Sequence, residues 1–109
     1  APPLSYGNEN NETVNLYEIK SKYTVLFFYK PDCQRCMRDK RVLNMVKKRR
    51  KDLEILHIDI SEENNKISQD IINQYDIMTT PMIYLLNDKK VIIAKQIKAE
   101  EIEFHIIKR

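Results

Sequence analysis

The sequence is poor in glycine, lacks tryptophan and has only two cysteines among its 109 residues. Its one glycine, Gly7, excludes the Gly-rich fingerprint with which dinucleotide-dependent enzymes bind their cofactor. Two cysteines are too few for the disulfide framework of a small secreted domain, which usually has about four or more. No apolar run approaches the roughly 18 residues of a membrane-spanning helix, because segments such as 25–29 have the length of a strand. We therefore expect no membrane span in this chain.

An excess of charge of one sign is also missing. The 19 basic and 16 acidic residues give a formal net charge of +3, which gives no support for a nucleic-acid or anionic-membrane partner. The basic run Lys47–Lys51 resembles a nucleic-acid patch by composition alone. We interpret it as a solvated helix end that the helix dipole favours. The sequence therefore predicts no nucleic-acid partner.

Length and composition favour a single domain over residues 1–109, since 42% of the residues are apolar and 32% are charged. Residues 1–15 are predicted to be an irregular segment, a loop or a loose hairpin, because they are polar and show little apolar periodicity. The N-terminus has no initiator methionine, basic segment or apolar signal core. Such an end is typical of a processed chain, so we expect any targeting signal to have been removed.

Apolar patterning predicts strands alternating with helices. The run 24–29 is β-branched and aromatic without polar interruption, as in a strand buried on both faces, and 53–60 is predicted to be a second buried strand. Segments 82–86 and 91–97 flank a polar turn, which predicts a hairpin. The expected helical segments are a turn at Leu16–Ile19, a helix from about Gln34 to Lys51, one opened by Ser61, Glu63 and Asn64 and running to Tyr75, and one from Ala99 to Lys108.

This order of elements predicts an α/β fold with a central mixed sheet flanked by helices. The first half forms a right-handed parallel crossover, and the end of the chain adds an antiparallel hairpin.

The motif Cys33-Gln34-Arg35-Cys36 lies where a buried strand is predicted to give way to a helix. A thiol at a helix N-terminus meets free backbone N–H groups and the positive end of the dipole, which favour the thiolate. Cys33 is therefore the candidate nucleophile, and Arg35 adds positive charge nearby. Cys36 lies one turn further on and points toward the packed face, as a resolving thiol must when it breaks a mixed disulfide.

Two other interpretations of the cysteine pair have less support. A disulfide that only staples the chain would close a four-residue loop and gain only about 2 kcal/mol. A metal site needs about four ligands, and the other soft candidates are His57, in a predicted buried strand, and His105. Haem attachment needs a histidine directly after the second cysteine, where Met37 stands. We therefore expect neither a metal nor a cofactor, and electrons would come from a separate redox partner protein.

Two segments carry a resemblance to a known family: 25–36, which ends in the cysteine pair, and 75–86, which contains Thr80-Pro81. Together they resemble the thioredoxin superfamily, and the opening loop and the turn before the first buried strand resemble the TlpA-like thiol-disulfide oxidoreductases of the bacterial cell envelope. The resemblance implies a thioredoxin-like fold, exchange with protein disulfides or dithiols, and a periplasmic or cell-envelope location, with a cytoplasmic one left open. The direction of electron flow also stays open, because reductases, isomerases and oxidases differ more in reduction potential than in fold.

The resemblance also implies a role for the Thr80-Pro81 pair. In the family a cis-proline loop packs beside the C-x-x-C motif, and Pro81 matches that proline. Thr80 would then offer its backbone N–H and C=O to an extended substrate segment, a mode of strand addition that reads little sequence.

The chain departs from the family pattern around the cysteines. Asp32 replaces the aromatic residue before the first cysteine, and its charge should partly oppose the thiolate. Phe27 occupies the position of the buried acid of thioredoxins, and Arg41 that of a usual proline. Asp39 is the candidate substitute proton acceptor, since TlpA-like proteins often carry a glutamate there. The alternative is an exposed ion pair between Asp39 and Arg35 at i, i+4 spacing.

The sequence thus predicts a dithiol-disulfide oxidoreductase that acts through a mixed disulfide at Cys33, resolved by Cys36. The alternative from another class is a non-catalytic binding module, part of a larger envelope protein, that uses the Thr80-Pro81 edge to hold peptides.

Overall fold

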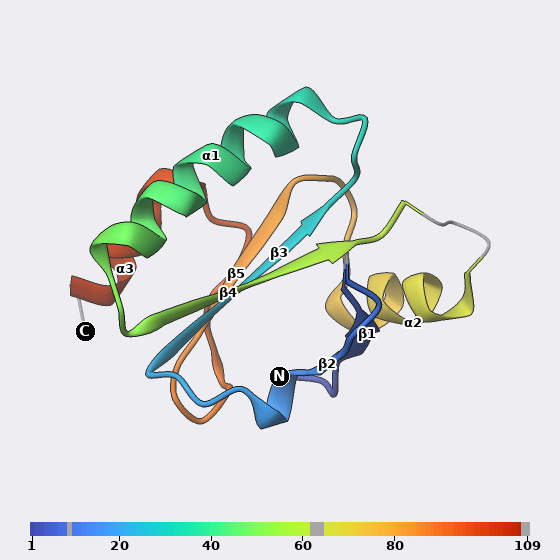
Figure 1. Cartoon of the computed structure of the whole chain (residues 1–109), viewed down its shortest axis with the longest axis horizontal. Helices are drawn as coiled ribbons and strands as arrows, with labels where there is room; N and C mark the ends of the chain where they lie inside the picture. The colour runs from blue at the N-terminus through green and yellow to red at the C-terminus, as the bar shows by residue number, and fades with distance from the viewer. Residues whose placement is uncertain (9, 62–64, 108–109) are drawn as a thin grey trace.

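The structure is a computed structural model that describes residues 1–8, 10–61 and 65–107. Its main sheet has the strand order β4-β3-β5-β6 (Figure 1), formed by β3 (Tyr23–Tyr29), β4 (Leu53–Asp59), β5 (Met82–Leu86) and β6 (Ile92–Ala94). β3 pairs in parallel with β4 and antiparallel with β5, and β5 pairs antiparallel with β6. The mixed sheet, with a parallel crossover followed by an antiparallel hairpin, confirms the predicted α/β fold.

Helices cover both faces of this sheet (Figure 1). One face carries α1 (Gln34–Arg49) and α3 (Ile102–Ile107), which follows the 3-10 turn η2 (Ala99–Glu101). The other face carries α2 (Lys66–Tyr75) and a hairpin of β1 (Ser5–Gly7) and β2 (Thr13–Asn15), followed by the turn η1 (Leu16–Glu18). In the described parts of the chain, no helix combines the length and the apolar character needed to cross a membrane.

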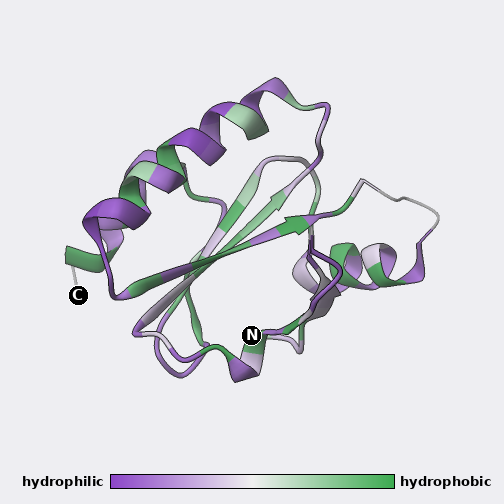
Figure 2. Ribbon diagram, viewed as in Figure 1, coloured by the Kyte–Doolittle hydropathy of each residue, from purple (hydrophilic) through white to green (hydrophobic). Residues whose placement is uncertain are grey.

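The central strand β3 separates two apolar cores. Its residues from Val25 to Phe28 have 0% exposure, because alternate side chains enter opposite cores. Val25 and Phe27 pack toward α1 and α3, whereas Leu26 and Phe28 pack toward α2. The prediction of a strand buried on both faces is therefore correct, and Figure 2 shows apolar residues along the strands of the sheet.

The N-terminal segment is more regular than predicted. Residues 1–15 contain the β1–β2 hairpin, in which Tyr6 pairs with Val14. Asn8 closes its loop, since its Oδ1 accepts from the backbone N–H of Glu12 at 2.9 Å. Tyr6 is buried against the α2-side core. Of the two predicted forms, a loop or a loose hairpin, the structure therefore has the hairpin. Its pairing could not be recognised in the sequence, because strands of three residues are too short for a clear alternation.

α2 begins later than predicted. Its N-cap is Asn65, whose Oδ1 accepts from the backbone N–H of Ile67 at 2.8 Å. The backbone N–H of Ser61 donates instead to Asp59 Oδ1 at 2.8 Å, so Ser61 belongs to a turn after β4. The predicted starting residues Glu63 and Asn64 lie outside the described residues.

Other boundaries differ by a few residues. α1 ends at Arg49 rather than Lys51, β4 ends at Asp59 rather than Ile60, and the last helical segment ends, within the described residues, at Ile107. Lys108, the predicted end of that helix, lies outside the described residues. β6 is shorter than the predicted 91–97, because Gln96 adopts a φ of 54°, which is incompatible with an extended strand.

Lys90, at the end of the predicted polar turn, is buried with 5% exposure. Its ammonium donates to Thr24 Oγ1 at 3.1 Å, and that hydroxyl also contacts Ser21 Oγ at 3.0 Å. Burial lowers the pKa of Lys90 below its usual range, and nearby Asp88 opposes this shift. The ammonium therefore lies in a site that disfavours its charge.

Replacing Lys90 with methionine is expected to raise the free energy of unfolding by about 1 kcal/mol at pH 7, because an apolar side chain avoids the cost of burying a charge. Thr24 keeps its contact with Ser21. Since the pKa is lowered on folding, the unfolded chain binds more protons, and wild-type stability should rise with pH up to the usual lysine pKa of 10.5. Urea denaturation at pH 7 and pH 10 should show the advantage of Lys90→Met shrinking at the higher pH. An equal or lower stability of the variant at pH 7 would contradict this expectation.

Candidate active site

Cys33 is the N-cap of α1, directly after the loop that leaves β3. Its backbone N–H donates to the carbonyl of Lys30 at 3.3 Å, which closes that loop into a turn. Its Sγ accepts from the backbone N–H of Cys36 at 3.1 Å. Cys33 is half-buried. The helix N-terminus thus supplies a backbone hydrogen-bond donor to this sulfur.

Cys36 occupies the first turn of α1 and is fully buried in the core beneath this helix. The side chains of Cys33 and Thr80 and the backbone of Lys30 lie close enough to act on the proton equilibrium of its thiol. Burial is the main reason that the pKa of Cys36 is raised to about 11, and the contact with Cys33 adds to the increase. Both cysteines are free thiols. The pair therefore combines a half-buried cysteine with a fully buried one whose thiol holds its proton more strongly than usual.

The loop before β5 lies beside the cysteines. The side chain of Thr80 contacts the Cys36 thiol, and this contact favours the thiolate of Cys36. The peptide bond between Thr80 and Pro81 is cis, and both residues are partly exposed. A groove of about 270 Å³ adjoins this loop, lined by Lys30, Ile60, Ile72, Ile77, Met78, Thr79 and Thr80. The predicted substrate-binding pair is thus brought next to the predicted reactive pair.

Asp39 follows Cys36 by one helical turn and is buried, with 8% exposure. Its Oδ1 accepts from Arg38 Nη1 at 3.0 Å, so its ion pair is with Arg38 and not with Arg35 as the alternative predicts. Burial raises the pKa of the Asp39 carboxyl above its usual range, against the opposing charge of Arg38. A buried carboxylate with raised proton affinity is what a proton acceptor needs.

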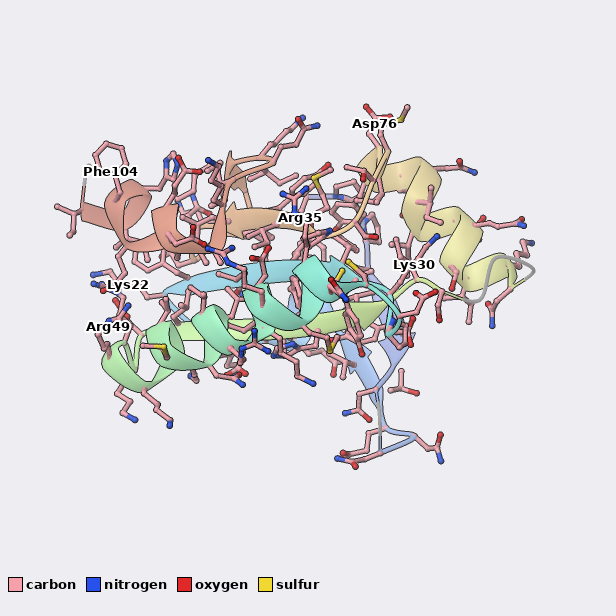
Figure 3. All side chains as sticks on the ribbon, turned by 90° about the horizontal axis from the view of Figure 1, so that it is seen from above. Lys22, Lys30, Arg35, Arg49, Asp76 and Phe104 are labelled. Carbon is pink, nitrogen blue, oxygen red and sulfur yellow. The ribbon has the colours of Figure 1, made fainter. Side chains whose placement is uncertain are left out.

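Arg35 is exposed at the start of α1. In Figure 3, Arg35 and Lys30 lie far from Arg49, which marks the other end of this helix. Arg35 makes a long-range contribution to Asp39 that favours the carboxylate. It therefore acts on Asp39 through its charge, without forming the ion pair that the alternative predicts.

Phe27 fills the position where the family carries a buried acid. Its ring stacks on Tyr29 with centroids 5.5 Å apart and meets the edge of His57 at 5.7 Å. His57 is thus a packed strand residue, as the sequence predicts. Among the residues that the structure describes, no group of three or more His, Cys, Asp or Glu side chains is placed to hold a metal ion.

Two contributors to the site were not found from the sequence. Lys30 binds the cysteines through its backbone, which any residue type could do. Glu100 accepts from Arg38 Nη2 at 3.0 Å and lies 62 residues away in the sequence. Only the docking of η2 against α1 brings this carboxylate near the site, so no local pattern could have indicated it.

Comparison with known proteins supports the same fold. The family model described as TraF, F plasmid transfer operon protein, matches residues 4–101. No curated protein matches the chain.

Three solved structures illustrate the similarity. The thioredoxin domain of a thiol-disulfide oxidoreductase from Bacteroides vulgatus superposes with a TM-score of 0.84 at 20% identity, over 99% of this chain and 93% of that one. A domain of a possible thiol-disulfide isomerase from Cytophaga hutchinsonii gives 0.80 at 27% identity, over 99% and 88%. A thioredoxin-like protein from Bacteroides caccae gives 0.80 at 23% identity, but this chain spans only 48% of its length. The thioredoxin-like fold is therefore established.

Proposed function

The chain belongs to the TraF family, F plasmid transfer operon protein, and we propose that it works as a protein thiol-disulfide oxidoreductase through Cys33 and Cys36. The observation that carries this proposal is the asymmetry of the pair. Cys33 is half-buried and its Sγ accepts a backbone N–H at 3.1 Å, whereas Cys36 is fully buried with its pKa raised to about 11. This asymmetry supports the assignment of Cys33 as the attacking sulfur and Cys36 as the resolving one.

The exchange has two steps. The thiolate of Cys33 attacks one sulfur of a substrate disulfide, which forms a mixed disulfide and releases the other substrate sulfur as a thiolate. Cys36 then loses its proton and attacks Cys33 Sγ, so that the Cys33–Cys36 disulfide forms and the second substrate sulfur leaves with its bonding electron pair. The substrate gains two electrons and the cysteine pair loses them.

The substrates of this exchange would be protein disulfides or dithiols. Thr80 lies beside the Cys36 thiol and also lines the groove, so an extended substrate segment could pair with the Thr80 backbone. A separate redox partner protein would return the cysteine pair to its starting state. The resemblance to envelope proteins supports a further part of the proposal, that this exchange takes place in the periplasm or cell envelope.

Reduction of insulin by dithiothreitol tests the proposed function. The wild-type chain should accelerate precipitation of the insulin B chain at least about tenfold over dithiothreitol alone, since a positioned thiolate at a helix N-terminus outcompetes a free thiol. Cys33→Ser should remove this acceleration completely. Phe104→Ala, at an exposed position of α3, is the matched control and should keep it. A wild-type rate equal to that of dithiothreitol alone would favour a non-catalytic binding module instead.

A further inference from the structure

Arg38 links a buried and an exposed carboxylate across two elements of the fold. Its Nη1 donates to Asp39 Oδ1 and its Nη2 donates to Glu100 Oε2, both at 3.0 Å. Asp39 and Arg38 belong to α1, whereas Glu100 belongs to η2. One guanidinium therefore fixes the position of Asp39 relative to the C-terminal part of the chain.

The three side chains differ in their contact with solvent. Asp39 is 11% exposed at its side chain, against 55% for Arg38 and 46% for Glu100. An ion pair as exposed as Arg38–Glu100 contributes little to stability, because water screens it. The Arg38–Glu100 pair lies beside the buried Asp39 carboxylate, however, and charges close to a buried group change the pKa of that group.

We propose that Arg38 and Glu100 are positioning residues that hold Asp39 beside Cys36 and set the pH range in which Asp39 accepts the Cys36 proton. This inference rests on the proposed function, because the proton is the one that Cys36 loses when it resolves the mixed disulfide. Asp39 and Cys36 are three residues apart on one face of α1 and both are buried. The proton passes from the Cys36 thiol to the Asp39 carboxylate, and the Cys36 thiolate then forms the bond to Cys33 Sγ.

The charged groups with the largest effects on Asp39 are Arg35 and Arg38 of α1 and Glu100 of η2. Both arginines favour the carboxylate, and Glu100 opposes it. Removing Arg38 should therefore raise the pKa of Asp39, and removing Glu100 should lower it. A merely structural role of the pair would not produce shifts of opposite sign.

The test measures resolution of a mixed disulfide between Cys33 and a cysteine-containing peptide. The mixed disulfide is formed from an activated peptide disulfide in acid, where Cys36 stays protonated, and a stopped-flow jump to a final pH between 4 and 9 starts its resolution. Arg38→Gln should move the midpoint of the pH profile upward and Glu100→Gln should move it downward, each by on the order of half a pH unit, because the removed charges are partly solvated. Arg38→Lys should give a midpoint between those of the wild type and Arg38→Gln. Lysine keeps the positive charge but lacks the two guanidinium nitrogens that bind Asp39 and Glu100.

The ion pair Arg49–Glu103 supplies matched controls. It joins α1 to α3 with Arg49 Nε 3.0 Å from Glu103 Oε1, and its side chains are 52% and 30% exposed. Neither residue is among the groups with the largest effects on Asp39. Arg49→Gln and Glu103→Gln should leave the midpoint where the wild type has it.

Carbon-13 NMR titration of the Asp39 carboxyl in the same variants separates this inference from the proposed function. Opposite shifts in both measurements support the inference. Unchanged NMR midpoints in Arg38→Gln and Glu100→Gln overturn it, and so does a resolution profile that Asp39→Asn leaves unaltered. A wild-type chain that never forms the mixed disulfide overturns the proposed function, and with it the role of Asp39 as acceptor, even where the NMR shifts appear.

Discussion

Replacing Cys36 with serine is expected to convert the chain into a trap for its substrates. Cys33 keeps its position at the α1 N-terminus and still attacks a disulfide, but the buried thiol that releases the substrate is gone. Intramolecular attack by a positioned group corresponds to effective concentrations of about 10⁵ M or more. The mixed disulfide should therefore persist at least about 1,000-fold longer than in the wild type when external thiol is kept low.

Non-reducing gels and mass spectrometry after incubation with insulin measure this effect. Cys36→Ser should accumulate a covalent adduct attached at Cys33, and Cys33→Ser should accumulate none, because the remaining Cys36 is buried and its pKa is raised to about 11. Equal trapping by both variants would reverse or remove the assignment of nucleophile and resolver.

Replacing Phe28 with alanine should cause the largest loss of stability. Phe28 has 0% exposure at the centre of the α2-side core, with its ring centroid 5.4 Å from that of Tyr75 and 5.8 Å from that of Tyr84. Removal of a buried phenyl ring costs about 3–5 kcal/mol, through lost transfer free energy and the cavity that remains. A domain of this size has a total stability of about 5–15 kcal/mol, so the variant should be close to unfolding at 37 °C.

Phe104→Ala is the matched control for this substitution. Phe104 lies on α3 with 60% exposure and extends from the end of the molecule in Figure 3. Its loss should change the free energy of unfolding by about 0.5 kcal/mol or less. Urea denaturation at pH 7 compares the two variants, and a cost below about 1 kcal/mol for Phe28→Ala would show that the two-sided burial of β3 is wrong.

The sequence predicts the sheet well because its signals are local and strong. A strand buried on both faces needs an unbroken apolar run, and residues 24–29 are buried throughout. The cysteine motif was also located correctly, since the end of β3 and the start of α1 follow from Pro31 and from the change in periodicity. The thiol contact with Thr80 needed the family resemblance, because no local pattern joins residues 36 and 80.

Features that depend on contacts between distant segments could not be predicted. Lys90 is in a polar turn by composition, yet the packing of that turn over Thr24 buries it. The ion-pair partner of Asp39 is the adjacent Arg38. The Arg38 guanidinium is oriented by its hydrogen bond to Glu100, which helical spacing does not indicate. The start of α2 was misplaced because Ser61 and Asn65 are equally good N-caps by residue type, and Asp59 binds the backbone of Ser61.

Equilibration of the chain with reduced and oxidised glutathione, followed by acid quenching, alkylation and mass spectrometry, tests the central claim most directly. If the two cysteines work as a dithiol pair, the chain should show one two-electron transition between its reduced form and a form with a Cys33–Cys36 disulfide. Little glutathione adduct should accumulate at any ratio of reduced to oxidised glutathione, because the Cys36 thiol displaces glutathione from Cys33. A chain that accumulates a glutathione adduct on Cys33 across the transition, and forms no Cys33–Cys36 disulfide, would contradict dithiol exchange by this pair.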